Sequence, residues 1–384
     1  MTSAKKVLLL VDSATSGVAG AYVDAIYRRL AHPDGVEVAV SYYFPFGYGK
    51  RIFFRYSELA AQRLYPLGRA RLYVRFAELL VSFTRLFTWV VVSRVRVVCY
   101  ALSSNLWVEY AFLWLLKCVT GVKVHLICHD VVPFVAPGED LAGMIRRRRQ
   151  FYVLAHRLIV HNDNSLDDLC AVFGISPDKV SRFPFPIYDC QRMGFREVDV
   201  LGETEKHRFL FIGHLRQEKG IGVLLEAWSR FRQLRHDAEL IIGGNIPPGC
   251  EYDLKSVSDR GIRFLARYLS DEEYFNLIRQ SDCVVLPYVR GTNSAVVSTV
   301  LSARKNLIVS DIPMFRSNPL IPLESFFACN DSERLAERFA HFCDLGHEQQ
   351  LQLDADVERR FARYEEVFRE QVNAVLDPSS LGAI

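Results

Sequence analysis

Short apolar runs, each about the length of a strand, alternate along the first half of the chain with stretches whose apolar residues recur at helical spacing. These strand candidates cover residues 6–12, 36–43, 94–102, 122–130, 156–163 and 180–186. Most of them lack the polar alternation of a half-exposed strand, so we expect the strands to be buried on both faces. Buried strands that alternate with helices are typical of a parallel sheet that helices cover on both sides.

The alternation is interrupted once and then resumes. Between residues 187 and 207 the chain carries glycine and charged residues without an apolar repeat, as a linker does. A second series follows, from the apolar run at 209–215 to the helical stretch at 332–342. The pattern predicts an α/β fold with two Rossmann-like, doubly wound parallel-sheet domains, at residues 1–190 and 205–355, that face a central cleft.

Composition narrows the classes of protein to which the chain can belong. Half of its 384 residues are apolar, which excludes disorder along the whole chain, and a net charge of +3 is too small to indicate a nucleic-acid partner. The nine cysteines stand singly, with no CxxC pair, as expected of a protein of the reducing cytosol without a metal site. The apolar run at 7–11 is too short for a signal peptide, and charged residues interrupt the apolar region 79–124. We therefore expect a cytoplasmic protein that does not span a membrane.

A loop with two cations follows the strand candidate at residues 209–212. Gly213 lets the chain turn sharply where the strand ends, and Arg216 and Lys219 add a bidentate fork and a point charge. Parallel sheets bind their ligands at this end of their strands, and a diphosphate requires such charges. The other interpretation is an ordinary solvated loop.

The turn in the sequence RGTNSAVV offers a second group of polar atoms. Thr292, Asn293 and Ser294 stand just ahead of the helix expected at residues 295–304, where N-capping residues occur. Their hydroxyls and amide, together with the free N–H groups of the first helical turn, favour an anion such as a phosphate.

These loops lie in stretches that resemble, in order and spacing, the GT-B glycosyltransferases of the family 4 kind. The likeness is carried by residues 124–134, 158–185, 209–228, 238–244, 261–311 and 329–339. It implies a GT-B fold in which the first domain binds the acceptor and the second binds a nucleotide-sugar donor, without a metal or another cofactor. A C-terminal helix, expected at 358–376 within residues 356–384, would cross back toward the first domain.

The resemblance also implies roles for particular residues. Arg216 and Lys219 would contact the donor phosphates, and the turn of Thr292, Asn293 and Ser294 would contact the distal phosphate or the sugar. Gly213 belongs to the same donor loop.

One further segment and one strand end complete the expected site. The segment Arg267–Asp271, which includes Leu269, would lie along the nucleotide base, and His129 would face the transferred sugar. His129 and Asp130 stand at the carboxyl end of the strand candidate 122–130, so the histidine can bind a sugar hydroxyl and the carboxylate can take the proton of the acceptor. The alternative is that Asp130 caps a turn and His129 is a structural loop residue, as we expect of His161.

The glycines after the first strand candidate do not match a dinucleotide-binding motif. Gly17 and Gly20 lack the GxGxxG spacing, and no acidic residue ends the next strand, so hydride transfer is a weak hypothesis. We expect Gly17 instead to let the backbone pass close to the donor or the acceptor.

The sequence departs from the family pattern at the donor loops. Many members carry two glutamates eight positions apart, where this chain has Gly291 and Thr299, and an arginine where it has His214. Donor identity and stereochemistry are therefore not implied, and Arg216 becomes the favoured phosphate ligand. A subset of similar transferases carries an arginine at the Arg216 position and an NSG-like turn in place of the first glutamate, which favours a variant enzyme over an inactive one.

Arginines alternate with aromatic and aliphatic residues between positions 50 and 89. Such a surface can attach to anionic headgroups without insertion, and the four arginines at 146–149 form a second basic patch. The alternative is a helix pair that packs on the core and carries a solvated basic face.

We thus predict a glycosyltransferase that moves a sugar from a nucleoside-diphosphate sugar to a glycan acceptor, lipid-linked through polyprenyl diphosphate, in bacterial surface polysaccharide or glycoconjugate assembly. It would work in the cytoplasm, peripherally on the inner face of the plasma membrane. The alternatives are a sugar-nucleotide epimerase of the same fold and a non-catalytic nucleotide-sugar-binding homologue.

Overall fold

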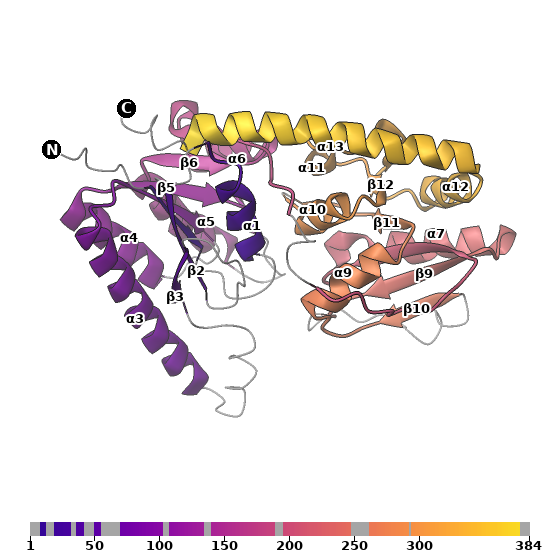
Figure 1. The fold of residues 1–384 in the computed structure, drawn as a ribbon, viewed down its shortest axis with the longest axis horizontal. Coiled ribbons are helices and arrows are strands. Elements are labelled where there is room, and N and C mark those ends of the chain that lie inside the picture. Colours follow the sequence, from indigo (N-terminus) through magenta and orange to yellow (C-terminus); the bar gives the residue numbers. More distant parts are fainter. Residues whose placement is uncertain are drawn as a thin grey trace. The chain divides into compact units, whose positions relative to one another are not determined.

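The computed structural model describes residues 8–12, 19–31, 36–41, 50–54, 70–102, 107–133, 140–188, 195–246, 261–291 and 293–376. The chain divides into two compact units, Met1–Pro186 with Val367–Ile384, and Ile187–Glu366. We call these the first and the second domain (Figure 1).

A seven-stranded parallel sheet forms the centre of the first domain (Figure 1). In spatial order its strands are β3 (Lys50–Phe54), β2 (Val36–Ser41), β1 (Leu8–Asp12), β4 (Val97–Leu102), β5 (Lys123–Cys128), β6 (Arg157–Val160) and β7 (Val180–Arg182). The helices described between them are α1 (Ala19–Tyr27), α3 (Ala70–Val92), α4 (Trp107–Thr120), α5 (Leu141–Leu154) and α6 (Asp163–Phe173), and the 3-10 turn η3 (Pro177–Lys179) precedes β7.

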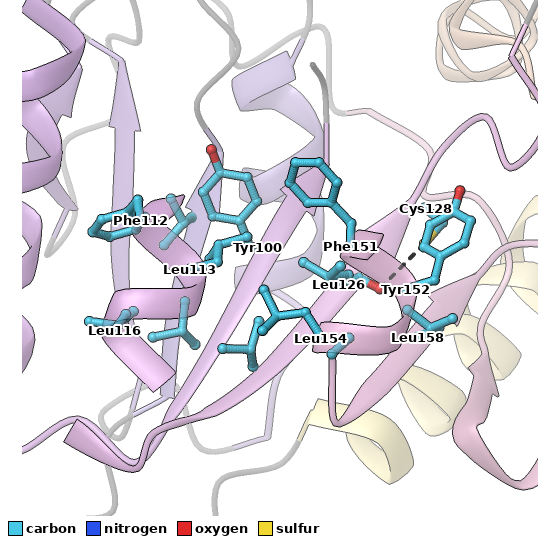
Figure 2. Packing of buried hydrophobic residues seen from close by; sticks show 14 of the residues in the cluster. Tyr100, Phe112, Leu113, Leu116, Leu126, Cys128, Phe151, Tyr152, Leu154 and Leu158 are labelled. Atoms are coloured by element: carbon cyan, nitrogen blue, oxygen red, sulfur yellow. Dashed lines mark hydrogen bonds between the residues drawn. The ribbon is translucent and has the colours of Figure 1, made fainter. Parts of the chain in front are cut away.

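Large side chains from α4 and α5 fill the space against this sheet. Figure 2 shows Phe112 and Leu113 of α4 beside Tyr100 of β4, with Phe151 and Tyr152 of α5 farther along the same layer. All five side chains are buried. Burial of one such side chain stabilises the fold by about 1.5–3 kcal/mol, so the continuous apolar runs of the sequence are accounted for by packing on the strands.

The second domain contains a six-stranded parallel sheet. In spatial order its strands are β10 (Ile262–Leu265), β9 (Ala238–Gly243), β8 (His207–Ile212), β11 (Cys283–Leu286), β12 (Asn306–Ser310) and β13 (Phe326–Phe327). Its described helices are α7 (Ile221–Leu234), α9 (Asp271–Arg279), α10 (Ala295–Ser302), α11 (Pro313–Arg316), α12 (Ser332–Cys343) and α13 (His347–Leu376), with 3-10 turns η5 (Gln217–Lys219) and η6 (Leu323–Ser325). The last residues of α13, from Val367, belong to the first domain.

Capping residues that the sequence displays set several helix ends. Asn162 accepts a hydrogen bond from Ser165 N at 2.8 Å ahead of α6, and Gly174 ends that helix in the left-handed conformation with φ of 64°. Ser270 and Glu273 form a capping box at the start of α9. Each cap satisfies backbone groups that the helix cannot pair itself.

Both sheets are doubly wound, as predicted. Strand order reverses between β1 and β4 in the first sheet and between β8 and β11 in the second. Ligands of such sheets bind beyond the carboxyl ends of the strands at this point of reversal. In the second domain the two loops concerned are the one after β8 and the one after β11.

Two elements differ from the pattern predicted by the sequence. Strand β3 is missing from that pattern, because its segment Lys50–Phe54 resembles the start of the basic and aromatic stretch; it pairs with β2 at the edge of the sheet. Helix α13 begins at His347 rather than at residue 358, since the polar residues of its first turns carry no apolar stripe to mark them.

The loops after β8 and β9 approach each other so closely that no side chain fits between them. Gly213 N donates to Gly243 O at 3.0 Å, and the φ angles of Gly213 and Gly244 are +132° and +142°. A Cβ added to Gly244 would lie 1.7 Å from Gly213 O. Glycine is therefore required at this edge of the sheet.

We predict that Gly244→Ala lowers the free energy of unfolding by about 3 kcal/mol or more, because it combines a left-handed φ with a backbone clash. Gly222→Ala is the matched control. A Cβ at Gly222, in α7, would meet nothing within 4 Å, and alanine should stabilise the helix by up to about 1 kcal/mol. Urea unfolding curves measure both, and a Gly244→Ala protein as stable as the parent would contradict this interpretation of the loop.

Candidate functional site

The loop that follows β8 lies against the segment that follows β11. Val289 N donates to Glu218 O at 2.9 Å, and Gly220 turns with φ of +71°. A Cβ on Gly220 would lie 1.8 Å from Pro287 O, so the two backbones touch. The sequence predicts two separate phosphate-binding loops, and within the second domain they form one surface.

One of the two predicted cations lies on this surface, and the other lies near a carboxylate of its own loop. Lys219 Nζ lies 3.7 Å from the centroid of the Tyr288 ring, which is buried. Such a cation–π contact holds the ammonium group over the segment after β11. The Arg216 guanidinium lies 3.7 Å from the Glu218 carboxylate and is half-exposed.

Helix α10 begins beside the loop after β8, since a Cβ on Gly213 would lie 3.9 Å from Val296 Cγ2. Its N-cap is Ser294, with φ of −138°, and no side-chain hydrogen bond caps the helix. The N–H groups of its first turn are therefore not capped by Ser294, and the N-terminus of a helix favours an anion. Asn293 directly precedes the cap and is half-buried. Thr292 lies outside the described residues.

At the two positions where similar transferases carry glutamates, this chain has Gly291 and Thr299. A Cβ on Gly291 would lie 2.8 Å from Met314 Sδ, so a thioether fills the space beside this residue. Thr299 is buried in α10, and its hydroxyl donates to Ala295 O at 3.0 Å. Neither position offers a carboxylate to a ligand.

The segment predicted to lie along the nucleotide base is held by its own contacts. Arg267 forms two hydrogen bonds to the Glu273 carboxylate, of 2.6 and 3.1 Å, which lower the pKa of Glu273 to about 2. Leu269 is buried, with its side chain beside Gly243 at the end of β9. The segment is thus fixed near the carboxyl ends of the second sheet, with its arginine engaged by α9.

In the first domain, the turn after β5 carries His129 and Asp130, and α5 braces it. Arg148 donates to the carbonyl oxygens of Asp130 and Val131, the latter at 3.0 Å, and the Tyr152 hydroxyl also donates to Val131 O at 3.0 Å. Asp130 itself is exposed and His129 is half-buried. The backbone at the predicted catalytic pair is therefore held by two side chains of one helix.

Three of the four arginines at 146–149 have contacts within the first domain. Arg148 braces the turn, and Arg149 Nε donates to Phe173 O at 3.2 Å, while Arg146 lies 4.0 Å from Asp140. Arg147 is exposed on the same helix. The bracing role has no local signal in the sequence, because the carbonyls that Arg148 binds are 17 and 18 residues away.

An aromatic cluster surrounds His129. The ring of Tyr22 on α1 meets the His129 ring edge-on with 4.5 Å between centroids, and the His161 ring lies nearly parallel to His129 at 5.5 Å. Phe185, after β7, contacts all three rings at 5.1–6.0 Å. The sequence predicts a structural role for His161 and does not single out Tyr22. The signal that could have placed His161 beside His129 is its position at the end of the strand next to β5.

Burial keeps both histidines neutral. It lowers the pKa of His129 to about 4, against a smaller opposing effect of Asp130, and lowers the pKa of His161 to about 3. A neutral imidazole both donates and accepts one hydrogen bond, as contact with a sugar hydroxyl requires. Gly17 lies outside the described residues.

Among the described residues, one group could hold a metal ion: His207, Asp237 and Cys343, whose ligand atoms lie within 4.8 Å of one another. These residues lie where β8 and β9 begin and α12 ends, at the opposite ends of the strands from the donor loops. Arg235 donates to both carboxylate oxygens of Asp237, at 3.1 and 2.7 Å. The group is thus apart from the loops after β8 and β11, which we call the candidate donor surface.

Comparison with known proteins gives a family match within the second domain. Residues 206–344 match the model of a family described as Glycosyl transferases group 1. They hold most of the second domain, including both loops of the donor surface.

Solved structures extend the likeness to the whole chain. It is similar to the HepE protein of Anabaena in complex with UDP-glucose, at 12% identity with a TM-score of 0.62, over 98% of this chain and 99% of that one. It is also similar to an α,α-trehalose 6-phosphate synthase of Burkholderia multivorans, at 12% identity with a TM-score of 0.60, over 99% of each chain. An E. coli trehalose-6-phosphate protein bound with UDP-2-fluoro glucose matches at 10% identity with a TM-score of 0.59, over 96% and 99%. No curated protein sequence matches significantly.

The chain has the GT-B fold, and most of its second domain, residues 206–344, matches the group 1 glycosyltransferase model. The prediction of a GT-B glycosyltransferase is thereby confirmed. The roles of individual residues stay predictions.

A second surface of this GT-B protein is formed by α3 and α4, which lie side by side in the first domain. Eleven of the twenty large apolar side chains that are exposed among the described residues belong to these two helices, among them Tyr73, Trp107 and Trp114, which are 78%, 70% and 51% exposed. The exposed charges described from residue 73 to residue 120 are those of Arg85, Arg94 and Arg96, all basic. No helix in the described part of the chain is long and apolar enough to cross a membrane.

The buried histidines predict a pH dependence of the first domain. Because their pKa values are lowered in the folded state, unfolding takes up protons below the ordinary pKa of 6.5. Their contribution to stability is fully present above pH 6.5 and is lost as pH falls toward 4 and 3. Two protons correspond to at most about 2.7 kcal/mol per pH unit.

We expect the double variant His129→Gln and His161→Gln to lose less stability between pH 6.5 and pH 4 than the parent. Urea midpoints of the first-domain transition at several pH values measure this. The matched control is His341→Gln, which changes a histidine on α12 of the second domain. Equal pH slopes in the parent and the double variant would show that these histidines are not held neutral.

Proposed function

We propose that the protein transfers a glycosyl group from a nucleoside-diphosphate sugar to an acceptor hydroxyl. The observation that carries this proposal is the uncapped N-terminus of α10, which shares one surface with Lys219 at the strand reversal of the second sheet. A diphosphate is the ligand that such a surface favours.

In the proposed reaction the acceptor oxygen forms a bond to C1 of the sugar, and the bond between C1 and the diphosphate oxygen breaks. Negative charge then builds on the leaving diphosphate. Lys219, Arg216 and the first-turn N–H groups of α10 would stabilise it, since fixed donors and cations act most strongly where charge develops. Asn293 stands one residue ahead of the helix cap and can both donate to and accept from sugar hydroxyls.

The first domain would supply the acceptor side. We propose that Asp130 takes the proton of the acceptor hydroxyl and that neutral His129 hydrogen-bonds the transferred sugar. The exposure of Asp130 and the lowered pKa of His129 support these roles, because a base must reach its proton and the imidazole must offer both kinds of hydrogen bond.

The nucleotide of the donor is proposed from the structural likeness. Two of the similar structures contain UDP-glucose or UDP-2-fluoro glucose, so uridine diphosphate sugars come first among donors. The absence of carboxylates at Gly291 and Thr299 supports a donor sugar held by other groups than in enzymes with paired glutamates. We propose that no metal takes part, as the resemblance implies.

For the acceptor we propose a glycan linked to polyprenyl diphosphate at an anionic membrane, as in surface polysaccharide assembly. The exposed apolar side chains of α3 and α4, flanked by arginines, support this, since such a face binds headgroups without insertion. A soluble sugar phosphate is the second candidate, because the similar trehalose 6-phosphate synthase points to acceptors of that kind.

Two alternative functions make different predictions. An epimerase of this fold would need no apolar face, and a binding homologue would show no turnover.

The decisive experiment incubates the protein with a set of UDP-, GDP- and dTDP-sugars and assays free nucleoside diphosphate and transferred sugar. Parallel reactions contain a polyprenyl-diphosphate-linked sugar, a sugar phosphate, or no acceptor, each with and without EDTA. We expect release that depends on the lipid-linked acceptor and resists EDTA. Epimerised sugar without transfer would favour the epimerase, and binding without release the non-catalytic homologue.

We predict that Arg216→Ala and Lys219→Ala each weaken donor binding by roughly ten- to a hundredfold, because a charge-assisted hydrogen bond contributes about 1.5–3 kcal/mol. The matched control is Arg230→Ala on α7, which removes an exposed arginine that pairs with Glu226. Titration calorimetry with the active donor measures all three. If the two loop variants bind as tightly as the parent, the phosphate site lies elsewhere.

We also predict that the α3 and α4 surface binds anionic vesicles. Arg85→Glu with Arg96→Glu should reduce co-sedimentation with phosphatidylglycerol vesicles at low salt roughly tenfold or more, because each basic residue near such a surface contributes about 1 kcal/mol. Trp107→Ser with Trp114→Ser should reduce it through lost apolar contact. Arg230→Glu with Leu234→Ser, on α7 of the second domain, is the control. A parent protein that stays in solution with these vesicles would refute the membrane proposal.

A further inference from the structure

A hydrogen-bonded pair lies directly behind the His129 ring. The Tyr22 hydroxyl and His161 Nε2 are 3.1 Å apart, and His161 Nδ1 is 3.2 Å from the carbonyl oxygen of Phe183. Tyr22 and His161 are both buried. The three residues come from α1, the end of β6 and the segment after β7, so the pair joins distant parts of the first domain.

The chemistry of the partners fixes the direction of both hydrogen bonds. A backbone carbonyl can only accept, so His161 Nδ1 carries the proton. The ring is neutral because burial lowers its pKa to about 3, and its Nε2 therefore has a lone pair and no proton. The Tyr22 hydroxyl must then donate to Nε2, which fixes the orientation of the tyrosine ring.

His129 is in contact with both members of this pair. The Tyr22 ring meets it at 83° and 4.5 Å, and the His161 ring lies at 28° and 5.5 Å. Two fixed rings that both contact the His129 imidazole leave it few orientations. An edge-to-face contact and a near-parallel contact are both arrangements that aromatic pairs prefer.

We infer that Tyr22 and His161 are positioning residues for His129. The carbonyl of Phe183 sets the tautomer of His161, His161 orients Tyr22, and the two rings hold the imidazole of His129 in the orientation needed by the transferred sugar. The last step rests on the proposed function. An apolar pair of the same size would pack equally well, whereas buried polar groups cost stability unless paired, so the hydrogen bonds serve orientation.

The test uses the full chain labelled with ¹⁵N-histidine. Imidazole nitrogen shifts at pH 7 give the tautomer of each ring, and His161→Gln and His129→Gln assign the two signals. We expect a single Nδ1–H tautomer for His161 in the parent. Tyr22→Phe keeps the ring and removes the hydroxyl, so His161 should lose part of its tautomer preference and the His129 signal should shift.

The kinetic arm separates positioning from stability. With the donor and acceptor found active, Tyr22→Phe should lower kcat about fivefold, as expected for one lost hydrogen bond, with KM for the donor within about twofold. Tyr100→Phe is the matched control, because it removes another buried hydroxyl of the same domain, which donates to Glu109 at 2.8 Å. It should lower stability and leave the His161 tautomer and kcat unchanged.

An Nε2–H tautomer of His161 in the parent would overturn the inference. So would a Tyr22→Phe protein with unchanged His129 signals, or one whose kcat equals that of the parent. Absence of transfer by the parent would instead refute the proposed function, and the nitrogen shifts, which need no substrate, would then decide the coupling of the three rings alone.

Discussion

Where Gly213 and Gly244 pass each other, backbone touches backbone and no side chain can intervene. The candidate donor surface depends on this contact, because it holds the loop after β8, which leads to η5, against the loop after β9. A second close approach, between Gly220 and Pro287, then lays the loop against the segment after β11. Exposed backbone, cations and a helix start are thereby gathered at one strand reversal, where a parallel sheet offers most room to a ligand.

The polar groups of this surface suit an anion better than a neutral ligand. Lys219 lies over the face of the Tyr288 ring, and such a contact compensates less of a cation's charge than a bound phosphate would. Helix α10 starts without a side-chain cap, and the nearby positions Gly291 and Thr299 bring no acid. A diphosphate here would accept hydrogen bonds from backbone donors, as anions do at helix N-termini.

The candidate site of the first domain combines neutral histidine rings with an exposed carboxylate. Aromatic rings pack around the half-buried His129 and burial lowers its pKa, while Asp130 stays exposed on the same turn. Arg148 binds carbonyl oxygens there and so fixes the backbone of the turn. A neutral hydrogen-bonding ring beside an exposed carboxylate is compatible with sugar recognition and proton transfer in one place.

Local patterns in the sequence predict the strands and the residues just after them, but few of the contacts between distant segments. Continuous apolar runs identify the strands of both sheets except β3, whose residues Lys50–Phe54 are too polar to stand out. Gly213, Lys219 and Ser294 can be found because glycine, charge and N-cap chemistry are local signals. Contacts across 139 residues, such as Tyr22 to His161, leave no local signal, and neither do the carbonyls that Arg148 binds.

We propose that a diphosphate binds between the loop after β8 and the start of α10. Hydrogen–deuterium exchange of the full chain with and without millimolar uridine diphosphate tests it directly, because bound phosphate oxygens protect the N–H groups that they accept from. The account predicts slowed exchange in peptides covering residues 213–220 and 293–298, and unchanged exchange around residues 199–208. Protection confined to any other part of the chain, with those two loops unaffected, would contradict it.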